Sequence, residues 1–311
     1  MKNKKIVIAG GTGFIGQAMA AYFGKENHIV IISRQSVNSH TNNYTNALLT
    51  PEQGYNITYR RWDGAHTEKH WTSELEAADI IINLAGKSVN CRYNEKNKKE
   101  IFNSRVNATS AIGEAIRNCI VPPKLWINAA SATIYRHAED HPQNEYNGEF
   151  TNDFSVQVCK RWEKTFADER TPFTRKIALR MAIALGNGGV MVPYFNLLKS
   201  GLGGRQGNGK QMYSWIHIED VCRSIEWFYD NKELEGVYNL SSPNPVTNNI
   251  FMKTLRKITG NVIGLPAYKW MLSIGSFIIG TEKELLLKSR WVLPAKLLET
   301  GFTFKFPLLE E

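Results

Sequence analysis

Residues 5–16, with the sequence KIVIAGGTGFIG, constrain the fold more than any other stretch of the chain. Residues 6–9 are apolar and predict a short buried strand, and an apolar helical pattern begins at Phe14. Between them stand three glycines at the spacing GxxGxxG: Gly10, Gly13 and Gly16. A strand that turns at once into a helix leaves unpaired N–H groups pointing at one spot, where the helix dipole favours negative charge. The segment therefore predicts a pyrophosphate site.

The three glycines have separate roles in such a turn. Gly10 takes a turn conformation that a Cβ would resist, Gly13 lets the backbone close on the ligand, and Gly16 lets the helix pack tightly on the strand. The strand before them and the helix after them distinguish this turn from a glycine-rich turn that binds nothing. The predicted contacts to a dinucleotide cofactor from this turn are Gly10, Thr12, Gly13, Phe14, Ile15 and Gly16.

The end of the second predicted strand, residues 28–33, indicates which dinucleotide fits. An NAD site places Asp or Glu there to bind the adenosine ribose, whereas this chain has Ser33 and Arg34. A guanidinium binds a ribose 2′-phosphate with charge-assisted hydrogen bonds, and a hydroxyl adds another. The sequence favours NADP(H) over NAD, and the alternatives for Arg34 are stacking on the adenine or plain solvation.

Further strands are predicted at residues 57–61 and 78–83 and are each followed by a candidate cofactor contact. Asp63 either contacts the adenine or caps a turn. Leu84, Ala85 and Gly86 follow the later strand, while the polar residues 37–54 predict a surface loop. Strands and helices alternate throughout, which predicts an α/β protein with a doubly wound parallel Rossmann sheet and ligands at the carboxyl ends of its strands.

Composition limits the other possibilities. The chain has 311 residues, 42% of them apolar, a net charge of +9 and four scattered cysteines without CxxC spacing. We expect no metal, reduced thiols and a cytoplasmic location, because no secretory pattern follows MKNKK. The apolar residues 262–280 contain Pro266 and Lys269 and predict a core helix, not a membrane span. No nucleic-acid-binding pattern occurs, so we expect a small-molecule ligand and a monomer or homodimer.

Four motifs resemble those of the extended short-chain dehydrogenase/reductases: GGTGFIG, NLAG at residues 83–86, SRVNAT at 104–109 and SATIY at 131–135. Three later segments, 201–221, 241–248 and 292–304, are similar to an atypical group within them, the "epimerase family". The resemblance implies an NADP-binding Rossmann domain over residues 1–185, to which 214–232 return. It also implies that residues 186–311 mainly form a smaller substrate-binding lobe.

The resemblance implies a catalytic site that is incomplete here. In the extended enzymes a Tyr of a YxxxK pair transfers a proton, its Lys lowers the Tyr pKa and binds the nicotinamide ribose, and an upstream Ser orients the substrate. Ser131 occupies the serine position. If Glu163 is aligned with the family pattern, the Tyr and Lys positions fall on Ser155 and Cys159. A register shifted by one gives Val156 and Lys160, so neither register supplies a Tyr.

Three accounts of this gap remain open from the sequence. Tyr135 acts as an alternative acid while Lys160 holds the ribose, or water or the substrate's own hydroxyl carries the proton, or the protein binds NADP(H) and catalyses little. Tyr135 is otherwise a buried packing residue with a satisfied hydroxyl.

Candidate ligand contacts also lie further along the chain. A buried strand at 176–185 carries Arg180, whose partner is either the cofactor or substrate or a structural carboxylate. The glycine-rich residues 201–209 predict a loop that closes over a substrate, or an irregular connection whose glycines only permit turns. The predicted substrate contacts here are Arg205, Gln211 and Trp215, whereas His217 and Asp220 are expected to be structural.

The sequence thus favours an NADP(H)-dependent oxidoreductase or epimerase-like enzyme that acts on a small polar substrate, free or nucleotide-linked. The alternative is an NADP(H)-binding sensor or scaffold protein with little or no catalysis, as the missing YxxxK pair suggests.

Overall fold

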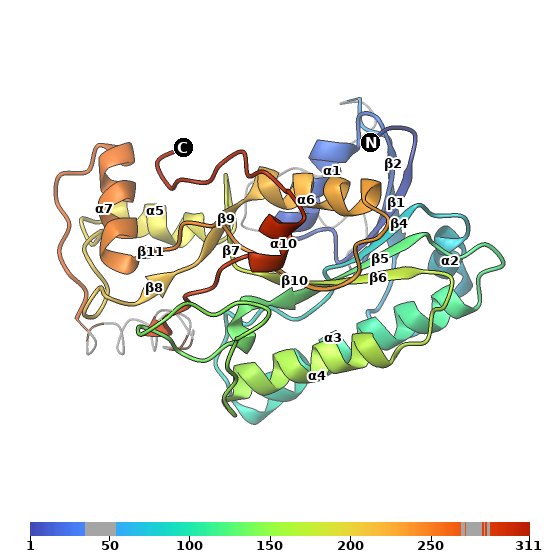
Figure 1. The fold of residues 1–311 in the computed structure, drawn as a ribbon, viewed down its shortest axis with the longest axis horizontal. Helices are drawn as coiled ribbons and strands as arrows, with labels where there is room; N and C mark the ends of the chain where they lie inside the picture. The colour runs from blue at the N-terminus through green and yellow to red at the C-terminus, as the bar shows by residue number, and fades with distance from the viewer. Residues whose placement is uncertain (35–53, 269–270, 272–281, 283, 285–286) are drawn as a thin grey trace.

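A computed structural model of the chain describes residues 1–34, 54–268, 271, 282, 284 and 287–311. Its centre is a seven-stranded sheet in which every neighbouring pair of strands is parallel. The strand order is β10-β6-β5-β4-β1-β2-β3 (Figure 1), which confirms the predicted doubly wound Rossmann fold. The strands are β1 Lys5–Ala9, β2 His28–Ser33, β3 Ile57–Arg61, β4 Ile80–Asn83, β5 Leu125–Ser131, β6 Arg175–Met181 and β10 Gly236–Leu240.

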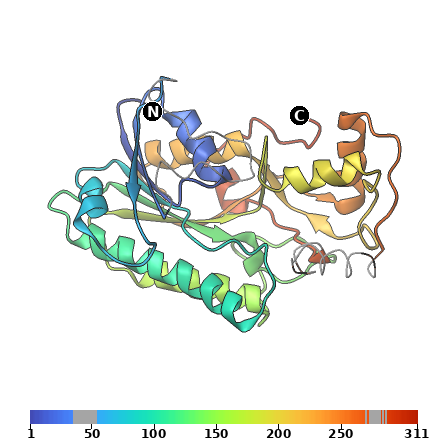
Figure 2. The same cartoon turned by 180° about the vertical axis from the view of Figure 1, so that it is seen from behind.

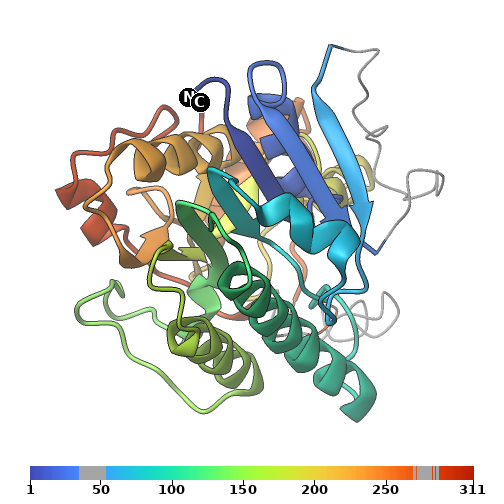
Figure 3. The same cartoon turned by 90° about the vertical axis from the view of Figure 1, so that its right-hand side faces the viewer.

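Both faces of the sheet are covered by helices because alternate strand residues point to opposite faces. Ile6 and Ile8 of β1 join a core with α1 Phe14–Phe23 and α6 Ile218–Asp230, whereas Val7 and Ala9 join a core with α3 Glu95–Arg117. Helix α4 Phe154–Asp168 lies beside α3 on that second face (Figures 1 and 2). Figure 3 shows the helices on either side of the sheet from another direction.

A smaller group of elements lies beyond the carboxyl end of β6 (Figure 1). Two short ladders form it, β7 Ile183–Leu185 with β9 Trp215–His217 and β8 Met212–Tyr213 with β11 Val246–Thr247. Helices α5 Met191–Lys199 and α7 Asn248–Thr259 share a core with these strands. The remaining short elements are α2 Lys69–Thr72, η2 Ser73–Leu75, η3 Ala132–Ile134 and α10 Ala295–Glu299. The predicted domain boundaries stay a prediction.

Two expectations for apolar segments are wrong. The predicted strand 176–185 is interrupted after Met181, because residues 183–185 leave the large sheet and pair with β9. Residues 261–266 are not helical, and Val262 is 95% exposed, so the predicted core helix does not begin there. Apolar composition alone does not show which surface will cover a segment. The remainder of that helix and of the loop at 37–54 lies outside the described residues, apart from single positions.

Among the described residues, no helix combines the length and the apolar character needed to cross a bilayer. The four cysteines are free, and Cys159 and Cys222 are buried.

Candidate functional site

The glycine turn places β1 against the turn that follows β4. Gly10 has a φ of +73°, and a Cβ there would lie 2.8 Å from the Cα of Ala85. A Cβ on Gly16 would lie 2.4 Å from the Cα of Gly11, so α1 approaches the turn backbone as closely as predicted. Gly13 is the N-cap of α1 and brings no side chain to the first N–H groups of that helix. The helix terminus is therefore open to an anion.

A buried polar network holds the carboxyl end of β4 beside this turn. The amide nitrogen of Asn83 donates to Oδ1 of Asn128 on β5, at 2.7 Å, and to Oγ1 of Thr109 on α3, at 3.2 Å. Asn83 Oδ1 accepts from the backbone N–H of Ala85 at 3.0 Å, and Trp162 of α4 donates to Thr109 at 3.1 Å. The network fixes the course of the chain at the predicted cofactor contacts Leu84, Ala85 and Gly86.

The end of β2 lies next to β1, on the side away from β4. The sheet order reverses between β1 and β4, where a doubly wound fold binds its ligand. Ser33 is buried there and Arg34 is exposed. Asp63, after β3, accepts from the N–H groups of Ala65 and His66, at 2.8 and 2.9 Å. Hydrogen bonds from the His66 side chain and backbone lower the pKa of Asp63 to about 2. Asp63 thus makes the turn that the sequence left as an alternative, and an adenine contact stays a prediction.

Helix α4 has no Tyr or Lys in the positions aligned with YxxxK. Ser155 hydrogen-bonds Glu284. Burial raises the pKa of the Cys159 thiol to about 12, so this side chain is uncharged at neutral pH. Lys160 donates to the Thr151 carbonyl at 3.2 Å. Neither register therefore places a phenol on the helix, and a contact of Lys160, the Lys position of the shifted register, with the cofactor ribose stays a prediction.

Ser131 stands at the end of β5 and is half-buried. Its Oγ accepts from the N–H of Thr133 at 3.2 Å and so caps η3. Because that contact uses only an acceptor lone pair, the hydroxyl hydrogen remains a donor. The position at the carboxyl end of a central strand is the one expected for a residue that orients a substrate.

Tyr135 and Arg180 form a buried structural cluster. Tyr135 is 1% exposed, and its hydroxyl donates to Asn239 Oδ1 at 2.9 Å and accepts from Arg180 Nη1 at 2.8 Å. Arg180 also binds both carboxylate oxygens of Glu163, at 2.8 Å each. The pKa of Tyr135 is raised, chiefly by burial, although Arg180 opposes the shift. These contacts favour the structural alternative for Tyr135 and Arg180 over a catalytic and a cofactor-binding role, because each polar group already has an internal partner.

The second lobe contradicts part of the predicted substrate surface. Trp215 is 2% exposed and packs in the core of this lobe, with its indole N–H 3.2 Å from the Asn244 carbonyl. Gln211 is also buried and donates to the Gln206 carbonyl at 2.9 Å. The glycines before them allow the chain to turn both side chains inward. Arg205 is exposed, as a substrate-closing residue must be.

His217 and Asp220 have structural contacts, as expected. His217 Nδ1 accepts from the Glu219 N–H at 3.2 Å and caps α6. The fully buried Asp220 accepts from the N–H groups of Lys305 and Phe306, at 2.8 and 2.9 Å. The carboxylate therefore fixes the carboxyl-terminal segment onto the Rossmann sheet's helix α6.

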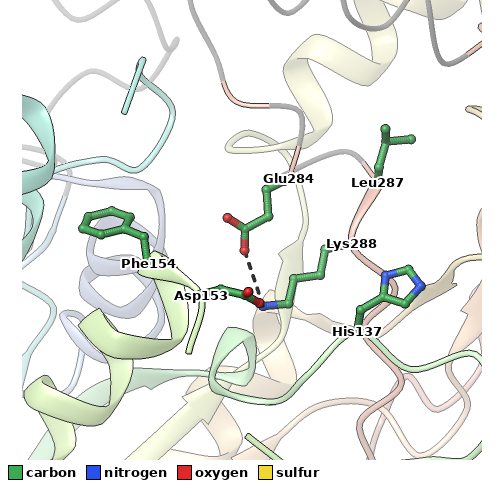
Figure 4. A pocket seen from close by; sticks show the side chains of 6 residues that line it. All are labelled: His137, Asp153, Phe154, Glu284, Leu287 and Lys288. Atoms are coloured by element: carbon green, nitrogen blue, oxygen red, sulfur yellow. Dashed lines mark hydrogen bonds and ion pairs between the residues drawn. The ribbon is translucent and has the colours of Figure 1, made fainter. Parts of the chain in front are cut away.

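A cavity of about 470 Å³ lies between the start of α4 and the side chains of Glu284, Leu287 and Lys288 (Figure 4). Lys288 projects into this space, where its Nζ lies 3.4 Å from Glu284 Oε1 and 3.7 Å from Asp153 Oδ2. The same Nζ donates to the Thr133 carbonyl at 3.3 Å. The cavity therefore adjoins η3, two residues from Ser131. Its lining residues are His137, Asp153, Phe154, Glu284, Leu287 and Lys288.

The sequence-based predictions missed two arginines near this place. Arg105 of α3 donates through Nη1 to the carbonyls of Lys87 and Ile101, at 3.1 and 2.9 Å, and its side chain lies against Gly86. Arg290 donates through Nε to Thr133 Oγ1 at 3.2 Å. The SRVNAT motif contains Arg105, but the motif alone does not indicate that its side chain lies against Gly86. Arg290 is 157 residues from Thr133 in the sequence, and no local pattern predicts their contact.

Comparison with known proteins decides the family. A model described as "NAD dependent epimerase/dehydratase family" matches residues 6–161. The chain belongs to this family. Residues 269–311 match a second model, described as a domain of unknown function, DUF1731.

Relatives of this family match the chain over almost its whole length. An "epimerase family protein" of Staphylococcus saprophyticus, SSP1921, is 31% identical over 310 residues, 99% of this chain and 97% of the relative. YfhF of Bacillus subtilis, also called an epimerase family protein, is 32% identical over 98% of this chain and 95% of the relative. The structure of human epimerase family protein SDR39U1 with NADPH superposes with a TM-score of 0.80 and 25% identity, covering 98% of this chain and 96% of that one.

Tyr135→Phe tests the structural assignment of that residue. The change leaves Arg180 Nη1 and Asn239 Oδ1 without a partner, so we expect it to lower the free energy of unfolding by about 1–3 kcal/mol. We expect Tyr22→Phe, at a 40% exposed site, to lower it by at most about 0.5 kcal/mol. Urea denaturation measures both. Equal small losses, together with abolished activity in Tyr135→Phe alone, would restore the catalytic hypothesis.

Gly10→Ala tests the close approach of the two turns. Gly10 and Gly64 both have positive φ, +73° and +89°, but a Cβ on Gly64 would meet no atom within 4 Å. Each replacement costs about 1–2 kcal/mol in backbone strain, and the steric overlap with Ala85 adds about 1–3 kcal/mol at Gly10 only. We expect urea denaturation to show the larger loss in Gly10→Ala. Equal losses would mean that the turns separate without cost.

Proposed function

We propose that this protein binds NADP(H) and acts as an oxidoreductase or epimerase-like enzyme on a small polar substrate, free or nucleotide-linked. The observation that carries the proposal is the close approach of Gly10 to Ala85. It leaves the start of α1 without a covering side chain at the edge where the sheet order reverses. The NADPH in the similar human SDR39U1 structure supports the same choice of cofactor.

The binding site for the cofactor uses three parts of the chain. The start of α1 receives the pyrophosphate through backbone N–H groups and the helix dipole. Arg34 at the end of β2 is exposed and supplies a cation for a ribose 2′-phosphate. The turn after β4, from Leu84 to Gly86, forms the opposite wall and is held by the Asn83 network.

The catalytic part of the proposal assigns a role only to Ser131. When bound, the nicotinamide supplies or accepts a hydride. Ser131 orients the substrate oxygen through its free hydroxyl hydrogen, because its Oγ already accepts from Thr133. With Tyr135 satisfied internally and α4 lacking a phenol, water or the substrate's own hydroxyl carries the proton.

Arg34→Asp tests the choice of cofactor. A carboxylate repels a 2′-phosphate but accepts hydrogen bonds from a ribose hydroxyl, so we expect NADPH affinity to fall at least about 30-fold and NADH affinity to change little. Fluorescence titration with each cofactor measures both, and Lys232→Asp, at an exposed position after α6, is the control for net charge. Equal losses for both cofactors would contradict a 2′-phosphate site at Arg34.

Ser131→Ala tests the catalytic role. We expect turnover of carbonyl and sugar-nucleotide substrates, followed by NADPH oxidation, to fall about 10²-fold or more while NADPH affinity stays within a factor of two to three. Ser200→Ala is the control, because the exposed Ser200 bonds the Asn196 carbonyl at the end of α5, in the second lobe. Undiminished turnover in Ser131→Ala would remove the residue from the mechanism.

The residues of α4 also favour a second function. With Ser155 and Cys159 in one register of the Tyr and Lys positions, the protein can still bind NADP(H) and signal its presence to a partner, a role that requires no proton transfer. Tight NADPH binding without turnover of any substrate in the same assay would select this sensor or scaffold function.

A further inference from the structure

Arg290 is a buried cation whose hydrogen-bonding capacity is largely unused within the described part of the chain. The residue is 8% exposed, and its Nε donates to Thr133 Oγ1 at 3.2 Å. Neither Nη1 nor Nη2 donates to any described residue, and no described carboxylate lies within ion-pair distance. Four N–H groups of one guanidinium are therefore left for a partner other than these residues.

The neighbouring buried arginine shows how unusual this is. Arg180 binds Glu163 through Nε and Nη2 and Tyr135 through Nη1, so its charge is neutralised within the fold. The Nη atoms of Arg290, in contrast, have no partner among the described residues and are not among the fully buried atoms that lack a hydrogen bond, so they reach open space. Their N–H groups are therefore accessible to a ligand.

The backbone of Arg290 is rigidly placed. Its N–H donates to the Met212 carbonyl at 2.9 Å, and its own carbonyl accepts from the Ser214 N–H at 3.0 Å. These bonds fix the residue on β8 of the second lobe, while its side chain reaches η3 of the Rossmann sheet. The guanidinium is thus held between the two groups of elements before any ligand arrives, which lowers the entropic cost of binding.

Charges of both signs lie around this point. Burial, the main cause, and the Glu163 carboxylate raise the pKa of the Cys159 thiol, whereas Arg105, Lys288 and Arg290 lower it, so three cations and one carboxylate lie near this thiol. The charge of Glu163 is offset by Arg180. The charge of Lys288 is offset by Glu284 and Asp153. Arg290 has no such compensation among the described residues.

We propose, on the basis of the function inferred above, that Arg290 binds an oxyanion of the substrate, a carboxylate or phosphate group, against Thr133 and beside Ser131. A guanidinium forks onto two oxygens of either group. Thr133 follows Ser131 by two residues, and its backbone N–H donates to Ser131 Oγ. The bound oxyanion therefore belongs to the reacting end of the substrate.

The cofactor's own phosphates have a different place in the proposed complex. They lie at the start of α1 and at Arg34, after β1 and β2, whereas Ser131 and Thr133 follow β5, on the other side of β4. The Arg290 site therefore distinguishes acidic substrates, such as sugar acids, hydroxy acids or phosphate esters, from neutral alcohols and sugars.

The test measures thermal unfolding of the full chain against increasing malonate or inorganic phosphate, with sodium chloride at matched ionic strength. Each titration is run with saturating NADPH, which fills the cofactor's phosphate sites, and again without it. Arg290→Leu removes the site. Arg175→Leu is the matched control, because this partly buried arginine binds backbone carbonyls at the opposite end of β6.

We expect one of the two oxyanions to raise the unfolding temperature saturably in the wild type and in Arg175→Leu. In Arg290→Leu the half-saturating concentration should rise at least tenfold, while NADPH affinity stays within threefold. The more effective anion identifies a carboxylate or a phosphate subsite. If Arg290→Leu does not fold, Arg290→Lys takes its place, with at least fivefold weakening expected because the fork is lost.

The proposal is overturned if neither oxyanion acts saturably, or if both arginine variants respond as the wild type does. If an oxyanion raises the unfolding temperature in an Arg290-dependent way but NADPH does not bind, the oxyanion site is supported and the cofactor proposal is contradicted. NADPH binding with no Arg290-dependent effect does the reverse, so the two failures are distinguishable.

Discussion

The rest of the structure depends on the contact between two backbone turns, one after β1 and one after β4. Gly10 faces Ala85 so closely that no Cβ fits between them, and α1 starts four residues later. This contact brings the open helix terminus, the β4 turn and the end of β2 to one edge of the sheet. Excluded volume permits only glycine at this contact, while the hydrophobic cores on both faces of the sheet supply its stability.

Buried polar groups then determine the shape of the edge beyond the glycine turn. Asn83 at the end of β4 hydrogen-bonds Asn128 of β5. Asn83 also bonds Thr109 of α3, which accepts from Trp162 of α4, so the network connects both strands to both helices. Arg180 and Glu163 do the same for β6 and α4. Each group has its hydrogen-bond partner within the fold, so these clusters stabilise the site's floor and leave its chemistry to other side chains.

The carboxyl-terminal segment completes the cleft from the second lobe. Lys288 and Arg290 both reach Thr133, one to its carbonyl and one to its hydroxyl, but only Lys288 is matched by carboxylates. Helix α4 carries no Tyr in either register of the YxxxK pattern. Arg105 of α3 and the cations Lys288 and Arg290 of the carboxyl-terminal segment lie near Cys159 of this helix.

The sequence by itself determined the Rossmann fold class, the bounds of its first five strands to within a residue or two, and the glycine turn, because strand and helix periodicity and the steric needs of glycine are local properties. It placed the end of β6 four residues too late and did not predict β10. It also left alternatives open for Asp63, Arg180 and Tyr135. Only the tertiary structure shows which partners these side chains have within the fold, and it alone buries Trp215 and brings Arg290 to Thr133. Burial and pairing depend on segments far apart in the chain, and no spacing within one segment records which distant surface will cover it.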